Sequence, residues 1–141
     1  MKNSKKPFIF GTVILLIFIV AISSQLSKNL QAEDILTDDF FNSDTILSIE
    51  RINKLNFTEI VTSKVIQNEI QVLLKEVNLK RTDDSYSPID ADYRIISTSN
   101  QEDQLYLFVE ENVIVFPHIS STGYKIKNNV DFMKTIDRFL Y

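Results

Sequence analysis

The chain has 141 residues, with 19 acidic and 15 basic side chains and a formal net charge of −4 at pH 7. It contains no cysteine, which excludes disulfide bonds, thiolate metal sites and a lipid-modified cysteine. Residues 24–141 alone carry 12 basic and 19 acidic side chains, and this acidic balance argues against binding to nucleic acid or to anionic lipid headgroups.

The first predicted element is a hydrophobic segment without any charge, over residues 7–23. A helix rises ~1.5 Å per residue and a bilayer core is ~30 Å thick, so about 20 such residues span it. The sequence therefore predicts a transmembrane helix over residues 7–23. The side chains expected in contact with membrane lipid are Phe8, Ile9, Phe10, Val13, Ile14, Leu15, Leu16, Ile17, Phe18, Ile19 and Val20.

Charges on either side of this segment predict its orientation. Lys2, Lys5 and Lys6 precede it, and basic residues beside a transmembrane helix stay in the cytoplasm. We therefore expect a cytoplasmic basic tail over residues 1–6 and a C-terminal domain outside the cell membrane. A cleaved signal peptide is the alternative, because Ala21 and Ser23 suit a cleavage site, and the domain would then be secreted.

Residues 24–44 are predicted to be an acidic linker. Its second part, "ILTDDFF", interleaves acidic residues with apolar ones. Phe40 and Phe41 are candidate partner contacts, because such mixed segments often become ordered only on binding. The favoured alternative is that the apolar side chains fold back on the domain as a first strand or helical turn.

The remaining residues, 45–141, are predicted to form one α+β domain. Residues 45–52 and 55–61 alternate between apolar and polar side chains, which predicts two strands joined by a turn at Asn53 and Lys54. A helix is expected over residues 62–80. Its predicted buried face consists of Ile66, Ile70, Leu73 and Val77, with Val65 and Leu74 beside them. Its predicted solvent face consists of Lys64, Gln67, Asn68, Gln71, Lys75 and Glu76.

Residues 81–88 are rich in aspartate and serine and predict a loop. Four more strands are then expected, over residues 93–98, 104–110, 113–117 and around 124–126. A final helix is expected with Asn128 or Asn129 as its cap. Its apolar face consists of Phe132, Met133, Ile136, Phe139 and Leu140. This order predicts a small antiparallel sheet with two helices packed on one face and the other face in solvent.

Catalytic and cofactor signals are weak throughout the chain. His118 is the only histidine, and it lies after Pro117 in a predicted turn. The acidic residues between 83 and 92 match no calcium-loop pattern, since the glycine for a sharp turn is missing. Two glycines cannot build a phosphate-binding loop. We expect no enzyme activity, no cofactor and no metal.

The order of elements, from "IERINKLNFTEIV" to "GYKIKNNVDFMKTIDRFL", resembles small exported or membrane-anchored domains of unknown function from Gram-positive Firmicutes. The resemblance covers residues 45–141. Many of those domains resemble lipoproteins with an anchoring cysteine, which this chain lacks. The resemblance implies a fold and a location in the cell envelope, and it transfers no catalytic residue.

The expected function is that of a single-pass, membrane-anchored extracytoplasmic module that binds an envelope protein or a peptide without catalysis. The first alternative is an immunity or inhibitor protein that intercepts a cationic peptide at the membrane surface. The second is a hydrolase that uses His118 with a carboxylate, for which the sequence identifies no partner group.

Overall fold

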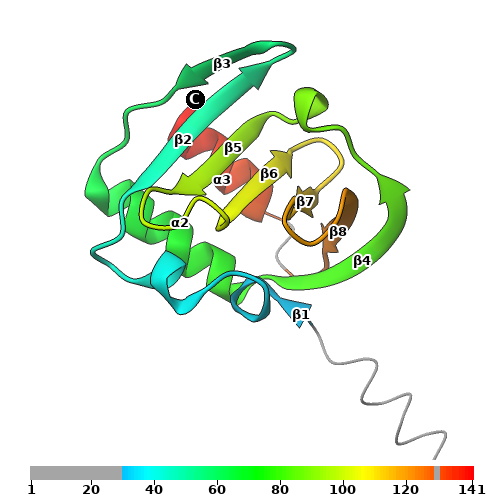
Figure 1. Ribbon diagram of the computed structural model, residues 1–141, viewed down its shortest axis with the longest axis horizontal. Helices are drawn as coiled ribbons and strands as arrows, with labels where there is room; N and C mark the ends of the chain where they lie inside the picture. The colour runs from blue at the N-terminus through cyan, green and yellow to red at the C-terminus, as the bar shows by residue number, and fades with distance from the viewer. Residues whose placement is uncertain (1–29, 129–130) are drawn as a thin grey trace, which may run out of the picture.

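The computed structural model of the protein describes residues 30–128 and 131–141. In them a single antiparallel sheet of eight strands carries two α-helices (Figure 1). The α+β class and the antiparallel sheet are therefore as predicted. The expected basic tail over residues 1–6 and the expected membrane span over residues 7–23 lie outside the described residues. Within the described ranges no helix has the length and apolar character needed to cross a membrane.

The elements follow a simple order along the chain. They are β1 (Leu30–Gln31), 3-10 turns at Ala32–Asp34 and Asp38–Phe41, β2 (Leu47–Asn53), β3 (Asn56–Glu59), α2 (Lys64–Glu76), β4 (Asn78–Ser85), a 3-10 turn at Pro88–Asp90, β5 (Tyr93–Ser97), β6 (Gln104–Phe108), β7 (Val113–Val115), β8 (Thr122–Ile126) and α3 (Phe132–Leu140). The strand order in the sheet is β1-β4-β8-β7-β6-β5-β2-β3. Strands β5 to β8 thus form a meander, whereas β2 and β4 join its two sides.

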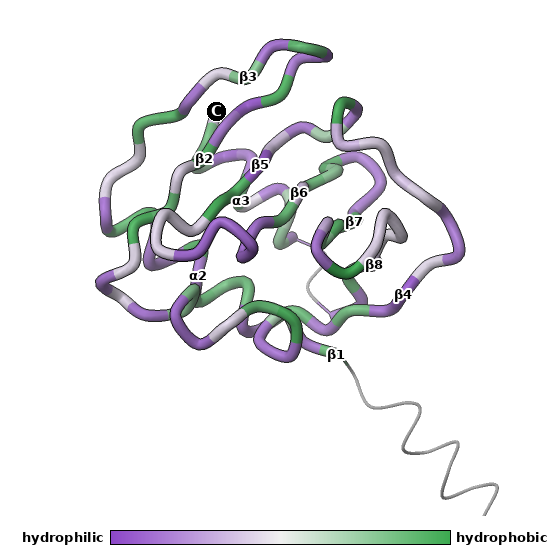
Figure 2. The backbone as a smooth tube through the Cα atoms, in the orientation of Figure 1, coloured by the Kyte–Doolittle hydropathy of each residue, from purple (hydrophilic) through white to green (hydrophobic). Residues whose placement is uncertain are grey.

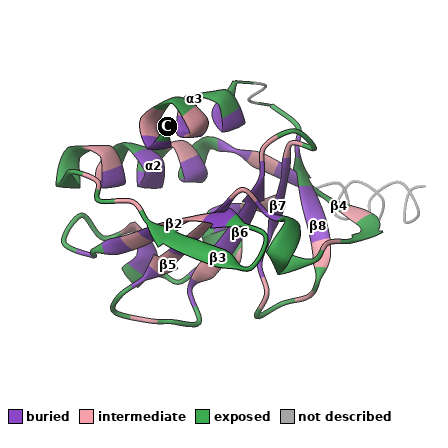
Figure 3. Cartoon of the chain, turned by 90° about the horizontal axis from the view of Figure 1, so that it is seen from above, coloured by how far each residue is buried: buried purple, intermediate pink, exposed green. Residues whose placement is uncertain are grey.

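Both helices lie on the same side of the sheet, as predicted (Figure 3). The main core fills the space between the helices and the sheet. Its fully buried side chains include Phe40, Ile49, Ile70, Leu74, Ile95, Leu105, Leu107, Ile114, Phe116, Phe132 and Ile136. Alternation along the strands directs every second residue toward the helices, which explains why the alternating segments of the sequence form this layer.

The opposite face of the sheet was predicted to be in solvent, and this expectation is wrong for its centre. A second cluster of buried side chains lies there, formed by Ile52, Ala91, Tyr106, Phe108, Val113 and Val115, with Tyr86 packed against them. Tyr86 covers this cluster from the loop after β4, and its ring centroid is 4.9 Å from that of Phe108. The strands β6 and β7 are therefore apolar on both faces.

Strand β4 replaces the loop that was expected over residues 81–88. It pairs antiparallel with β8, from Leu79 opposite Ile126 to Ser85 opposite Thr122, with a register shift between Arg81 and Ser85. Figure 2 shows that β4 is mostly hydrophilic. Hydrogen bonds of the main chain hold it in the sheet, so its side chains carry no alternating apolar signal.

The predicted linker is part of the domain from Leu30 onward. Strand β1 pairs with β4, and Phe40 is fully buried in the main core. Phe41 is half-buried, with its ring 5.2 Å from that of Phe40 and the Lys75 amine 5.1 Å above it. The candidate role of Phe40 and Phe41 as exposed partner contacts is thus wrong for Phe40. The alternative, in which this segment folds back, describes the structure.

Two helix boundaries differ from the prediction. Helix α2 begins after Ser63, whose hydroxyl accepts a hydrogen bond from the Ile66 amide at 3.3 Å, but it ends at Glu76 because Val77 is extended. Helix α3 follows Asp131 and not Asn128. Asn128 instead joins α2 to β4: it accepts from the Asn78 amide at 2.6 Å and donates to the Glu76 carbonyl at 2.8 Å.

Candidate functional site

The most unusual feature of the domain is the arrangement of polar and apolar residues on α2. Gln67 and Gln71 are buried, whereas Val65 is 67% exposed and Val72 is 56% exposed. The sequence pattern had placed Val65 on the buried side and both glutamines in solvent, and these expectations are wrong. Helix α2 therefore presents two valines, seven residues apart, to solvent.

The buried glutamines have a structural role that explains this rotation. Gln71 donates its side-chain amide to the carbonyl of Phe40 at 2.5 Å and to that of Asn42 at 3.1 Å. The side-chain oxygen of Gln67 accepts from the Leu47 amide at 3.0 Å. Residues 40–47 pass beneath α2 without complete main-chain pairing, and the two glutamines satisfy their buried polar groups.

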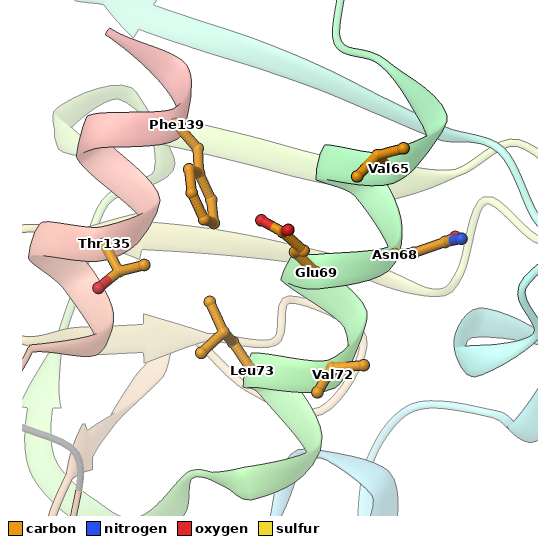
Figure 4. Close-up of a pocket in the computed structure, with 7 residues that line it drawn as sticks. All are labelled: Val65, Asn68, Glu69, Val72, Leu73, Thr135 and Phe139. Atoms are coloured by element: carbon orange, nitrogen blue, oxygen red, sulfur yellow. The ribbon is translucent and has the colours of Figure 1, made fainter.

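An apolar groove of about 440 Å³ lies on the outer side of α2 and α3 (Figure 4). It is lined by Val65, Asn68, Glu69, Val72, Leu73, Thr135 and Phe139. In Figure 4 Phe139 lies near the level of Val65 and Thr135 lies farther along, so the two helices run in opposite directions. The exposed valines form one wall of a concave surface, which is the usual shape of a binding site.

Leu73 lines this groove and packs against the edge of the main core. It is only half-buried, whereas its neighbour Leu74 is completely buried. The helical face that packs on the sheet consists of Gln67, Ile70, Gln71 and Leu74. Of the predicted buried face, Ile70, Leu74 and Val77 are buried, whereas Ile66 and Leu73 are only half-buried at its edge. Leu73 is therefore also part of the candidate binding surface.

Glu69 supplies a carboxylate within the apolar groove. Figure 4 shows its carboxylate between the side chains of Phe139 and Leu73. Glu69 is exposed, and within the described part of the chain no hydrogen bond or ion pair engages it. An unpaired carboxylate beside apolar side chains favours a ligand that combines an apolar surface with a cation.

The outer side of α3 carries the opposite charge. Lys134 and Arg138 are both exposed and lie four residues apart, hence on one face of the helix. Lys134 is 3.9 Å from the Asp131 carboxylate, an exposed pair in which solvent weakens the attraction. The Arg138 guanidinium lies 5.7 Å from the centre of the Phe139 ring. We call the exposed residues Val65, Glu69, Val72, Glu76, Lys134 and Arg138, together with the groove, the outer helical face.

A second polar cluster joins β2, β5 and α3. The Tyr93 hydroxyl donates to Asp137 at 2.7 Å, and Arg51 donates to the Leu140 carbonyl at 3.0 Å and to the Tyr93 hydroxyl at 3.4 Å. Burial raises the pKa of Tyr93 above its ordinary value of 10.0, and the hydrogen bond to Asp137 raises the pKa further. The groups satisfy one another and hold the end of α3 against the sheet.

Residues with catalytic potential do not converge in the described part of the chain. His118 is exposed in the loop between β7 and β8. Asp83 and Asp84 are exposed on β4, whereas Asp92 accepts from the Val109 amide at 2.7 Å and so has a structural role. Among residues 30–128 and 131–141, no three His, Cys, Asp or Glu side chains are grouped as metal ligands would be.

Comparison with known proteins identifies no relative: no family model, no curated protein and no solved structure matches this chain. The outer helical face is therefore the candidate site on its own physical evidence. Sequence reasoning missed it, although the spacing of Val65 and Val72 was a usable signal. Two apolar residues seven apart on a helix share a face, and they cannot lie on the face that contains Gln67 and Gln71.

Proposed function

We propose that the protein is a non-enzymatic binding or accessory module of the cell envelope. In this proposal residues 7–23 anchor it in the membrane as a single span, with residues 1–6 in the cytoplasm and the domain outside. The uncharged length of this segment and the lysines before it support the location. The alternative is a domain secreted after signal cleavage.

The observation that supports a binding role is the exposure of Val65 and Val72 beside the groove. A helix packed on a sheet normally exposes polar side chains, since exposed valines contribute nothing to the core. Here the fold buries two glutamines and leaves two valines outside. Such an apolar surface with charged residues around it is typical of a protein-interaction site.

The location is tested by expressing the full chain in a Gram-positive host and measuring its intact mass in membranes and in the medium. Full-length chain in the membrane fraction is the expected result. A shortened chain in the medium would instead support secretion, and its mass would give the cleavage site.

The binding surface is tested by placing a photoreactive amino acid at position 72 in the full chain, in the same host. We expect a covalent adduct between position 72 and a bound protein. Mass spectrometry locates this adduct in α2, and Val65→Ser suppresses it. The matched control carries the same group at Leu55, which is 79% exposed but lies in the turn between β2 and β3. Equal labelling at both positions, or none at position 72, would contradict the proposed surface.

A second candidate function is interception of a cationic peptide at the membrane surface. Glu69 favours it, because an unpaired carboxylate in an apolar groove fits the charged side of an amphipathic helix. A synthetic peptide of lysine and leucine in helical spacing would then bind the full chain, more weakly at high salt. Glu69→Gln should weaken this binding, whereas Glu59→Gln on β3 should not. Equal effects of the two variants would exclude this role for the groove.

A further inference from the structure

The outer helical face is self-complementary in charge. On α2 the exposed residues alternate between apolar and acidic, from Val65 through Glu69 and Val72 to Glu76, at the spacing that places them on one face. On α3 the exposed charged residues of the outer side include Lys134 and Arg138. The exposed face of α2 is therefore apolar and acidic, whereas α3 contributes two basic residues, with Asp131 beside Lys134 at its start.

We propose that the occupant of this face is a second copy of the same chain. The inference rests on the proposed function, because it names the partner of the same surface. A twofold axis parallel to the two helices would place α2 of one copy over α3 of the other, and the reverse. Both contacts then form at once, as an isologous interface requires.

The helix directions make this arrangement a four-helix layer. Because α2 and α3 run in opposite directions (Figure 4), each α2 would also be antiparallel to the α3 it faces. Antiparallel helices pack closely at small crossing angles. Val65, Val72, Leu73 and Phe139 from each copy would form the apolar centre, which fills the groove.

The charges of the face support the same pairing. Glu69 lies at the level of Thr135, so after the rotation it would face the part of α3 between Lys134 and Arg138 of the second copy (Figure 4). An arrangement with α2 over α2 would bring Glu69 and Glu76 of one copy close to Glu69 and Glu76 of the other. Like charges in contact disfavour that alternative.

The size of the face predicts a weak dimer. The helices α2 and α3 have 13 and 9 residues, which correspond to about 20 Å and about 14 Å of helix. Stable interfaces bury about 800 Å² per partner, and a face of this size lies near or below that value. We expect a dissociation constant of the order of micromolar in solution, with more dimer when both copies are confined to one membrane.

The test is sedimentation velocity of the full-length chain in a density-matched detergent, over a range of protein concentrations. The wild type should associate reversibly to a dimer, and the dimer should weaken as salt is raised. Glu69→Lys should raise the dissociation constant about tenfold, since it replaces an attraction by a repulsion. Glu59→Lys on β3 is the matched control and should leave it unchanged.

Charge-reversal rescue distinguishes the proposed pairing from other dimers. The double change Lys134→Glu and Arg138→Glu should weaken the dimer, and adding Glu69→Lys should restore it to within about threefold of wild type. Val65→Ser with Val72→Ser should also weaken it, and both substitutions preserve helix propensity. A dimer without rescue would overturn the α2-over-α3 arrangement.

Failure of this inference is separable from failure of the proposed function. The chain could stay monomeric at all concentrations while position 72 still crosslinks to a different protein. This result would contradict the dimer but not the proposed binding function. A monomeric chain without any adduct at position 72 would overturn both.

Discussion

Gln71 of α2 donates its buried side-chain amide to the main-chain carbonyl of Phe40, 2.5 Å away. This hydrogen bond holds the segment before β2 against the helix. Gln71 thereby occupies a core position that a leucine would otherwise take. The amide also reaches the Asn42 carbonyl at 3.1 Å, so both of its donors are in use.

The substitution Gln71→Leu should destabilise the domain although it adds an apolar side chain to the core. It leaves the carbonyl of Phe40 buried without this donor, at a cost of about 1–3 kcal/mol. Urea unfolding followed by circular dichroism measures this cost. Gln101→Leu, in an exposed loop, is the control and should change stability little. A stabilised Gln71→Leu variant would contradict the role given to the glutamine.

Two adjacent leucines of α2 should respond very differently to the same substitution. Leu74→Asp places a carboxylate in the fully buried core and should cost about 4 kcal/mol or more, enough to unfold a marginally stable domain. Leu73→Asp places it at the half-buried edge of the core, where water can reach it, and should cost less, about 1–2 kcal/mol. Thermal melting of both variants checks this order, and the reverse order would refute the orientation of α2.

Gly123 should tolerate no side chain because it lies beneath Tyr86. A methyl group at this position would stand 2.5 Å from the Tyr86 ring and 2.5 Å from a Val113 methyl group. Gly123→Ala should therefore cost about 1–3 kcal/mol through overpacking, as measured by urea unfolding. The pair Gly123→Ala with Tyr86→Ala should lose less than the sum of the single changes, because the clash with the ring is gone. Strict additivity would show that the ring is not the obstacle.

Stability should fall at high pH because of Tyr93. Its pKa is raised by burial and by the hydrogen bond to Asp137, so the unfolded chain loses this proton at a lower pH than the folded one. The contribution is complete below the unfolded value of about 10 and is lost as the pH rises through the folded pKa. Urea unfolding at about pH 8, below the unfolded value, and at about pH 10.5, above it, should show the loss. Tyr93→Phe should reduce it, and an equal loss in both proteins would assign it to other groups.

The strands of the central meander could be predicted from the sequence because their side chains alternate. β5 and β6 match the predicted segments 93–98 and 104–110 closely, and Asn112, in the short turn before β7, has a φ of 57°. Burial on a sheet face forces this alternation, so the pattern and the structure have one cause.

Strand β4 and the rotation of α2 could not be predicted in the same way. β4 is held by main-chain pairing with β8, and its exposed side chains obey no apolar period. The α2 face is set by buried main-chain groups of residues 40–47, to which Gln67 and Gln71 supply an acceptor and a donor. Both depend on long-range contacts, whereas the apolar pattern of a short window reports burial alone.

The candidate site was missed for a related reason. A valine on a predicted amphipathic helix is read as a core residue, so Val65 was assigned to the inside. The charges of the site, on Glu69 and Arg138, look like ordinary solvent-exposed residues in the sequence. Only the packing of α2 beside α3 shows that they surround one apolar groove.

The attachment of β1 also has a mechanical consequence. In the part of the chain that the structure describes, Leu30 and Gln31 pair with β4 through two residue pairs, at the edge of the sheet. A pulling force on the chain ahead of Leu30 would break these two residue pairs first. It would then pull the Phe40 side chain out of the core, while the strands β5 to β8 bear none of the force. Release of residues 30–46 would lengthen the connection by on the order of 50 Å. In the proposed membrane-anchored protein, this segment would be an extensible tether.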